Sequence, residues 1–195
     1  MIITIARECG CKGDKIGMAL AEKYGLPFYN KKAISQLAKE KGNYEKFPDF
    51  YGEIPVDTLL YSISLAEEDG RLYQTPQKAL APVIGKEDCI ILGRCGNYVF
   101  RDRDDVVSVF LTGDIAWREE NIAKKHDVSL KKAHNIVSET DHRRASYHKY
   151  YTGETWGMAG HYDLCLDVSK IGVEGALRVV GRYLEEIQMT RKAKV

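Results

Sequence analysis

The chain opens with a short apolar run, a polar stretch that contains glycines, and then apolar residues at helical spacing. Residues 2–5 read Ile-Ile-Thr-Ile, a β-branched run that predicts a strand buried on both faces of a sheet. Apolar side chains recur at helical spacing between residues 16 and 24, and Gly10 and Gly13 lie before them. A strand, a glycine-bearing loop and a helix in this order predict a phosphate-binding loop, in which backbone N–H groups and a helix N-terminus hold an anion.

Apolar spacing predicts alternating strands and helices along the rest of the chain. Strands are expected at residues 2–5, 26–29, 89–92, 106–111 and 164–168. Helices are expected at about 14–24, 31–41, 56–69, 76–85 and 173–187, with two more that begin after Thr112 or Asp114 and at Ser129. Asp14 and Asn30 are expected to cap their helices, and Gly25 to end the first one. Residues 42–55 predict an ordered loop, and residues 192–195 a frayed tail.

Strands that alternate with helices predict a parallel sheet with right-handed crossovers, and therefore an α/β fold. In a doubly wound sheet, ligands bind beyond the carboxyl ends of the strands. Arg7, Arg94 and Asp167 stand at three of those expected strand ends. We therefore expect the functional site at this edge of the sheet.

Composition narrows the class of protein. A length of 195 residues suits one domain over residues 1–195, and 44% apolar content supports a globular core. Lys plus Arg total 29 against 28 for Asp plus Glu, so net charge gives no sign of a nucleic-acid partner. The apolar run before Arg7 is too short for a signal peptide, and no apolar run approaches the length of about 18 residues that a membrane span needs. Five cysteines without disulfide-scaffold spacing favour a reducing compartment, so we expect a soluble cytoplasmic protein whose oligomeric state stays open.

The glycine-bearing loop departs from the usual phosphate-loop string, G-x-x-x-x-G-K-[ST]. With Arg7 at the first glycine of that string, Lys12 takes the second glycine, Gly13 the lysine, and Asp14 the hydroxyl residue that touches Mg²⁺. Lys12 or Lys15 can supply the missing charge from a neighbouring position, because the ammonium is a point charge on a long stem. The charge of Asp14 would oppose a phosphate unless Mg²⁺ lies between them.

Four segments of the sequence resemble a known family. They are residues 2–17 (IITIARECGCKGDKIG), 91–96 (ILGRCG), 150–157 (YYTGETWG) and 162–167 (YDLCLD). Together they resemble the cytidylate kinase-like proteins, relatives of bacterial cytidylate kinase among the P-loop nucleoside monophosphate kinases. This resemblance implies a P-loop NTPase-type three-layer fold with a five-stranded parallel sheet, helices on both faces and a helical lid. It also implies ATP with Mg²⁺ as phosphate donor and a nucleoside monophosphate, first of all CMP, as acceptor.

The resemblance implies roles for particular residues and segments. The monophosphate-binding lobe would cover approximately residues 30–85, and the lid approximately residues 141–160. The donor phosphates would be held by Arg7, Glu8, Cys9, Gly10, Cys11, Gly13, Asp14 and Ile16. Catalytic charge would come from Arg143, Arg144, Lys12 and Lys15, and the acceptor would be held by Asn30, Lys31, Arg94 and Asp167. Cys95 stands where the Gly-Arg-Asp segment of cytidylate kinases has its Asp.

Each of these interpretations has a simpler alternative. The loop can be an ordinary tight turn, Arg94 can pair with an acidic residue at 102, 104 or 105, and Asp141 can pair with Arg144 at the end of a solvated helix. Arg118 with its acidic neighbours reads as a charged outer face. The five histidines lack metal-binding spacing, and His142 and His148, which flank the lid arginines, are expected at the surface rather than against a phosphate. Two thiols, Cys9 and Cys11, give only a weak metal pattern, so no metal site is predicted, although a helix N-terminus can stabilise a thiolate there.

Two functional alternatives to a kinase remain open from the sequence. The first is a catalytically degenerate nucleotide-binding or regulatory protein, which the altered loop and Cys95 favour. The second is a structural or interaction module that binds no nucleotide. Titration with nucleotides and an assay for product distinguish all three functions.

Overall fold

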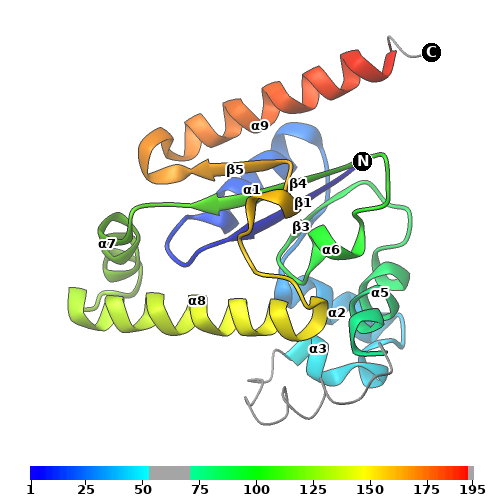
Figure 1. Ribbon diagram of the computed structural model, residues 1–195, viewed down its shortest axis with the longest axis horizontal. Helices are drawn as coiled ribbons and strands as arrows, with labels where there is room; N and C mark the ends of the chain where they lie inside the picture. Colours follow the sequence, from blue (N-terminus) through cyan, green and yellow to red (C-terminus); the bar gives the residue numbers. More distant parts are fainter. Residues whose placement is uncertain (53–70, 193–195) are drawn as a thin grey trace.

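A five-stranded parallel sheet forms the centre of the computed structural model, which describes residues 1–52 and 71–192 (Figure 1). Its strands are β1 (Ile2–Arg7), β2 (Phe28–Tyr29), β3 (Cys89–Leu92), β4 (Val106–Thr112) and β5 (Leu164–Asp167). They lie in the order β2-β3-β1-β4-β5, and every neighbouring pair is parallel. The predicted parallel α/β sheet is confirmed, and β1 continues two residues beyond the expected strand, as far as Arg7.

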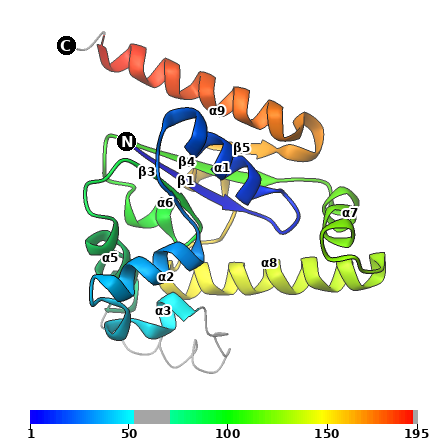
Figure 2. The same cartoon turned by 180° about the vertical axis from the view of Figure 1, so that it is seen from behind.

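Helices cover both faces of this sheet. They are α1 (Gly13–Tyr24), α2 (Lys31–Glu40), α3 (Pro48–Gly52), α5 (Arg71–Ile84), α6 (Gly96–Val99), α7 (Ile115–His126), α8 (Leu130–Thr152) and α9 (Val168–Lys192), with short 3₁₀ turns at Tyr44–Lys46 and Ala159–His161. The two views of the ribbon show α1 and α9 on one face and α2, α3, α5, α6 and α8 on the other (Figures 1 and 2). Helix α7 follows β4 directly and lies beyond the carboxyl ends of the strands.

Alternation along β1 explains why this strand is apolar on both faces. Ile3 and Ile5 pack with Leu20 of α1 and Val180 of α9, whereas Ile2 packs on the opposite face with Leu80 of α5. All of these side chains are buried. A central parallel strand is covered on both sides, so both of its alternating sets of side chains are apolar.

Helix caps show where short-range sequence signals decide the structure. The side chain of Asn30 accepts a hydrogen bond from the Ala33 N–H at 3.0 Å, as expected, and Asp114 accepts one from the Trp117 N–H at 3.1 Å. Gly25 ends α1 with a φ of 64°. The expected cap by Asp14 is wrong, because the cap residue of α1 is Lys12 and Asp14 lies inside the first turn.

Several segments differ from the sequence expectation. The expected loop at residues 42–55 contains the 3₁₀ turn Tyr44–Lys46 and helix α3. Helix α5 begins at Arg71 rather than at residue 76, and the last helix begins at Val168 with a kink at Gly172. The helix expected at residues 56–69 and the end of the expected tail lie outside the described residues. Helix α8 continues to Thr152 and so includes the first part of the expected lid at residues 141–160.

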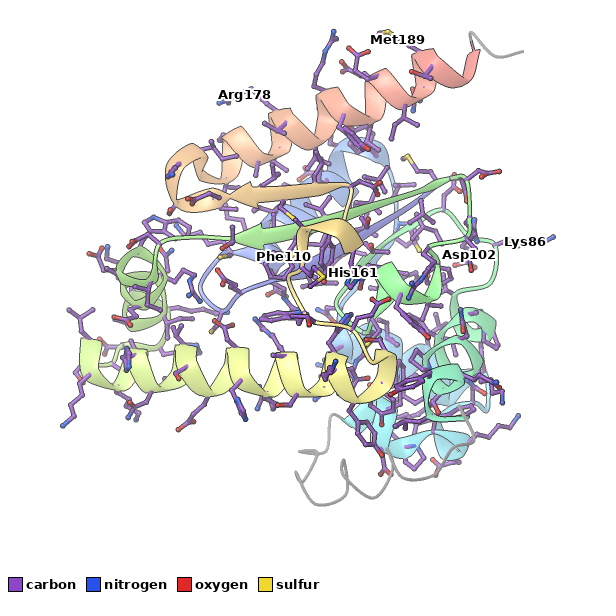
Figure 3. All side chains as sticks on the ribbon, in the orientation of Figure 1. Lys86, Asp102, Phe110, His161, Arg178 and Met189 are labelled. Atoms are coloured by element: carbon purple, nitrogen blue, oxygen red, sulfur yellow. The ribbon has the colours of Figure 1, made fainter. Side chains whose placement is uncertain are left out.

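The outer side of α9 faces solvent. Figure 3 shows Arg178 and Met189 pointing from this helix away from the sheet, whereas Phe110 lies inside the molecule. Met189 is 55% exposed and Phe110 is 6% exposed. None of the described helices is both long and apolar enough to cross a membrane.

Candidate functional site

Residues 8–12 connect β1 to α1 at the carboxyl edge of the sheet, where the sequence predicts a phosphate-binding loop. Gly10 has a φ of 88°, and Lys12 has a φ of 56°. The Ile16 N–H donates to the Lys12 carbonyl at 3.0 Å, closing the first helical turn. The N–H groups of residues 13–15 precede this bond and have no intrahelical acceptor, so the helix presents donors at its N-terminus.

Lys12 occupies a backbone conformation that favours glycine. A left-handed φ costs a non-glycine residue roughly 1–2 kcal/mol, and Lys12 stands where the usual loop string has its second glycine. Its ammonium lies 5.0 Å from the centre of the Trp117 ring on α7. The loop therefore keeps the glycine geometry without the glycine.

Arg118 on α7 holds the outer side of this loop. Its guanidinium donates to the Cys9 carbonyl at 3.3 Å, to the Gly113 carbonyl at 3.0 Å and to the Asp141 carboxylate at 2.5 Å. Arg118 is only 8% exposed, so the expectation of a charged outer face is wrong for this residue. The sequence signal that could have found it is its place in the helix that follows β4 at the same sheet edge.

Two further side chains fix the loop backbone from α7 and α8. The Asp141 carboxylate accepts the Cys9 N–H at 2.6 Å, and the Asn121 amide donates to the Gly10 carbonyl at 3.1 Å. Asp141 also lies 4.0 Å from Arg144, so the expected pair across one helical turn is present, but the Arg118 contact is shorter. The loop conformation thus depends on partners more than 100 residues away in sequence.

The Glu8 carboxylate points to β4. It accepts hydrogen bonds from the Thr112 hydroxyl at 2.7 Å and from the Gly113 N–H at 3.1 Å, and it lies 3.5 Å from the Arg118 guanidinium. Glu8 therefore ties the ends of two neighbouring strands together. Its negative charge is balanced by Arg118.

The inner side of the loop opens onto a cavity of about 460 Å³. The charged side chains that line it are Arg7, Glu8, Lys12, Asp14, Lys125, Arg143 and Arg144. Five of these are cationic and two are anionic, which favours a negatively charged ligand. Of the other residues expected in the loop, Lys15 is exposed, and the Ile16 side chain is buried in the core between α1 and the sheet.

The arginines expected in a lid lie on a regular helix. Arg143 and Arg144 belong to α8, and the Arg144 guanidinium donates to the Arg7 carbonyl at 3.0 Å. One and two turns further along, Tyr147 and Tyr151 are buried in the core. Residues 141–152 of the expected lid therefore form a continuous helix that packs against the body of the protein.

A second, smaller cavity of about 40 Å³ lies beside the first, between the ends of β1 and β3 and helix α8. Four arginines line it, Arg7, Arg94, Arg143 and Arg144, together with Thr4, Asn97, Tyr147, His148 and Trp156. His148 is 3% exposed, so the expectation of a surface histidine is wrong here. Burial lowers the pKa of His148 to about 4, so this ring is neutral at pH 7.

Arg94 is bound to the protein's own backbone. Its guanidinium donates to the carbonyls of Phe50 and of Tyr51 (2.7 Å to Tyr51) and to the Tyr147 hydroxyl at 3.1 Å. The side chain is 4% exposed. Arg94 therefore connects the end of β3 with α3 and α8.

Asp105, one of the acidic partners considered for Arg94 from the sequence, pairs with Arg103 at 2.7 Å. The Arg103 guanidinium makes two hydrogen bonds to this carboxylate, at 2.7 and 2.8 Å. These bonds lower the pKa of Asp105 well below its usual range. The acidic turn before β4 is thus stabilised locally.

The remaining acceptor candidates lie apart. Asn30 caps α2 next to β2, and the Lys31 ammonium donates to the Gly52 carbonyl at 2.9 Å. Asp167 ends β5, at the opposite edge of the sheet from β2, and accepts hydrogen bonds from the hydroxyl and N–H of Ser169. These bonds hold the pKa of Asp167 below its usual value. The structure brings Arg94 to the loop but does not bring Asn30 and Asp167 together.

The two loop cysteines are buried. Cys11 packs in the core, and burial, with the nearby charge of Glu8, raises its pKa to about 12. The hypothesis of a stabilised thiolate is therefore wrong for Cys11. Cys9 packs against Ile122, Ala133 and Val137. Among residues 1–52 and 71–192, no group of three or more His, Cys, Asp or Glu side chains is arranged to hold a metal ion.

Solved structures share this arrangement of strands and helices. A crystal structure of an uncharacterized protein from Eubacterium ventriosum ATCC 27560 is 26% identical, with a TM-score of 0.70 over 95% of this chain and 98% of that chain. A gluconokinase from Sinorhizobium meliloti 1021 has a TM-score of 0.52 at 16% identity, covering 96% of this chain and 95% of its own. A shikimate kinase from Bacteroides thetaiotaomicron has a TM-score of 0.52 at 13% identity, over 95% and 98%. At the last two identities the likeness concerns the fold alone, which is that of the P-loop kinases.

Comparison with protein families addresses the sequence directly. None of the curated proteins matches the sequence. The model of the cytidylate kinase-like family matches residues 2–170, which include the loop, both cavities and the arginines of α8. The chain therefore belongs to the cytidylate kinase-like family.

Proposed function

We propose that the protein is a nucleotide-binding phosphotransferase that moves the γ-phosphate of ATP to a nucleoside monophosphate, with CMP as the first acceptor to test. One observation carries the proposal. The loop between β1 and α1 presents helix N-terminal N–H groups to a cavity that Arg143 and Arg144 also line. Phosphoryl transfer needs mainly positioning and positive charge around the transferred group, and both are present at this edge of the sheet.

In the proposed reaction the transfer is in line, without a covalent enzyme intermediate. The loop N–H groups, with Lys12 or Lys15 nearby, hold the donor phosphates, and Arg143 with Arg144 holds the transferring group. Arg94, Asn30 and Lys31 serve the acceptor, whereas Asp167 at the far edge of the sheet requires a rearrangement to take part.

Magnesium would enter this site with ATP. Asp14 lines the loop cavity and is exposed, so its carboxylate offers an oxygen ligand there. Mg²⁺ is usually held by one or two carboxylates together with substrate phosphates and water, which fits a single acidic residue. When bound, the ion would supply positive charge that neutralises the phosphates, and Asp14 in the first turn of α1 would hold it.

The proposal includes the organisation of the chain and its location. Residues 1–195 form one kinase-like domain, in which residues 30–85 include the acceptor lobe and residues 141–160 the arginine-bearing lid. A cytoplasmic location is supported by the five cysteines, which form no disulfide with one another. The proposed partners are ATP and a nucleoside monophosphate, without nucleic acid or membrane.

A coupled assay with each common nucleoside monophosphate and Mg–ATP tests the proposal. We expect turnover that depends on the acceptor and falls at least about tenfold in Arg143→Ala, because that arginine would bind the transferring group. Lys131→Ala is the matched control, since it removes an exposed positive charge from the same helix. Absence of turnover with every acceptor, in folded protein, would contradict the kinase proposal.

A second candidate function is a nucleotide-binding protein without catalysis. It is favoured by the Arg94 guanidinium, which binds the Phe50 and Tyr51 carbonyls instead of being presented to an acceptor. The lysine position of the loop also holds Gly13. Calorimetric titration separates the two candidates, because tight ATP binding without any product would select the second one.

A further inference from the structure

Arg7, the last residue of β1, sends its side chain across the first residue of α1. A Cβ atom placed on Gly13 would lie 2.8 Å from Cγ of Arg7 and 3.3 Å from both Cβ and Cδ of Arg7. The backbone of Gly13 is helical, so its lack of a side chain is explained by this contact and not by an unusual φ. The Arg7 side chain thus occupies the space in which a residue at position 13 would begin its own side chain.

A second glycine makes room for the other end of Arg7. A Cβ atom on Gly93, at the end of β3, would lie 2.8 Å from Nη1 of Arg7. The side chain therefore extends from the N-terminus of α1 to the end of the neighbouring strand. Arg7 also lines both the larger loop cavity and the smaller cavity that contains Arg94.

The contact between Arg7 and Gly13 accounts for two departures of the loop from the usual sequence string. Position 13 is where the usual loop has the lysine that reaches the donor phosphates, and position 7 is where it has a glycine. In this chain the long cationic residue is Arg7, at the usual glycine position, and the glycine is Gly13, at the usual lysine position. The exchange leaves one long cationic side chain over the helix N-terminus.

We propose that Arg7 is the catalytic cation of the loop and replaces the lysine that is missing at position 13. The proposal rests on the proposed phosphotransferase function. Arg7 lines both the larger loop cavity and the smaller arginine-lined cavity beside it, so its positive charge is close to the place where the proposed phosphoryl transfer needs charge stabilisation. A guanidinium is always charged and donates to two phosphate oxygens at once, so it serves this position as well as an ammonium does.

Helix α8 holds the backbone of Arg7 in place. The Arg144 guanidinium donates to the Arg7 carbonyl at 3.0 Å, so the Arg144 side chain and the Arg7 backbone are fixed relative to each other. In this proposal Arg7 acts on the ligand, and Arg144 positions the Arg7 backbone in addition to its proposed contact with the transferring group. Lys12 and Lys15 then have auxiliary roles, since Lys12 lies against the Trp117 ring and Lys15 is exposed.

A stability cycle tests the contact without any ligand. Gly13→Ala is expected to lower the melting temperature in the wild-type background, because the new Cβ meets the Arg7 side chain. In the Arg7→Gly background the same substitution is expected to raise the melting temperature, since alanine is favoured over glycine in a helix. Equal shifts in the two backgrounds would overturn the contact on which the proposal depends.

A relocation experiment tests the catalytic role. Arg7→Gly is expected to lower turnover at least about a hundredfold and ATP affinity at least about tenfold. In the double variant Arg7→Gly/Gly13→Lys, turnover is expected to be at least about tenfold higher than in Arg7→Gly. Lys23→Gln, which removes an exposed charge from the last turn of α1, is the control and is expected to change turnover less than threefold.

The measurements separate failure of this proposal from failure of the proposed function. If the wild type neither binds ATP nor turns over, the proposed function fails. In that case, calorimetric binding of inorganic pyrophosphate to the wild type and to Arg7→Gln decides whether Arg7 is the loop cation, and equal affinities overturn the proposal. If the wild type is active and Arg7→Gly keeps its activity, the proposal alone is overturned.

Discussion

The Arg144 guanidinium donates a hydrogen bond to the backbone carbonyl of Arg7, 137 residues earlier in the chain, at 3.0 Å. This bond joins α8 to the residue where β1 ends and the loop begins. Because Asp141 of the same helix accepts the Cys9 N–H, α8 holds the loop at two backbone positions. The helix that carries the candidate catalytic arginines is therefore also the support of the candidate phosphate loop.

Asp141→Asn should loosen the loop. The oxygen of an asparagine can accept from the Cys9 N–H or from Arg118, but not from both. In either orientation its NH₂ group, a donor, faces the remaining donor. We expect exchange of the Cys9 amide hydrogen to accelerate at least about tenfold, corresponding to roughly 1.4 kcal/mol. Hydrogen exchange followed by NMR measures this directly.

Glu139→Gln is the control for this substitution. It makes the same charge change two residues earlier on α8, at an exposed position. In Glu139→Gln the amide hydrogen of Cys9 should exchange at the wild-type rate. Identical rates in Asp141→Asn and Glu139→Gln would show that Asp141 does not restrain the loop.

Arg94→Lys should destabilise the protein, whatever Arg94 does for a ligand. The Arg94 guanidinium donates from two nitrogens, to the Tyr51 carbonyl and to the Tyr147 hydroxyl. A lysine ammonium has a single nitrogen and cannot reach both, so at least one buried oxygen loses its donor. We expect a decrease in the free energy of unfolding of about 2–4 kcal/mol. Urea denaturation measures it, and Arg182→Lys, at a side chain 65% exposed, should change it by less than about 0.5 kcal/mol. Equal stabilities would mean that Arg94 has no structural role.

His148 should make the protein less stable in mild acid. Burial depresses its pKa to about 4, whereas the unfolded chain protonates it near pH 6.5. Between these values the unfolded state binds more protons, so the stability contributed by His148 is present above pH 6.5 and is lost as pH falls towards 4. The shift corresponds to roughly 3 kcal/mol.

The contribution of His148 can be isolated by substitution. Unfolding free energies at pH 5 and pH 7 should differ less in His148→Gln than in the wild type. His142→Gln, at an exposed position of the same helix, should keep the wild-type pH dependence. A wild-type pH dependence in His148→Gln would argue against a buried neutral ring.

Thiol labelling should distinguish the loop cysteines from Cys165. Cys11 is fully buried with a pKa raised to about 12, and Cys9 is 7% exposed, whereas Cys165 is exposed. In native protein we expect one rapidly reacting thiol, which disappears in Cys165→Ser. Rapid labelling of Cys11 would restore the hypothesis of a reactive thiol in the loop.

Short-range features of the fold were predictable because they depend on neighbours in sequence. Apolar periodicity located the strands, including Cys89–Leu92 without error. The cap at Asn30 was recognised from residue type, and of the two caps expected for α7, Thr112 or Asp114, the structure has Asp114. The Asp14 cap prediction failed because the left-handed Lys12 already ends the loop two residues earlier than expected. The exposed and buried faces of α7 were not separable, since Arg118 looks like any charged helix residue in the sequence.

The sequence by itself determined the strand–loop–helix frame, the parallel α/β class and the substitution of glycine for lysine at position 13. These follow from local spacing and residue type, which act over a few residues. Only the tertiary structure decided that Arg118 and Asp141 hold the loop, that Arg94 binds the backbone of α3, and that the Arg7 side chain lies over Gly13. These relationships join side chains from different strands and helices, and packing of the sheet brings them into contact.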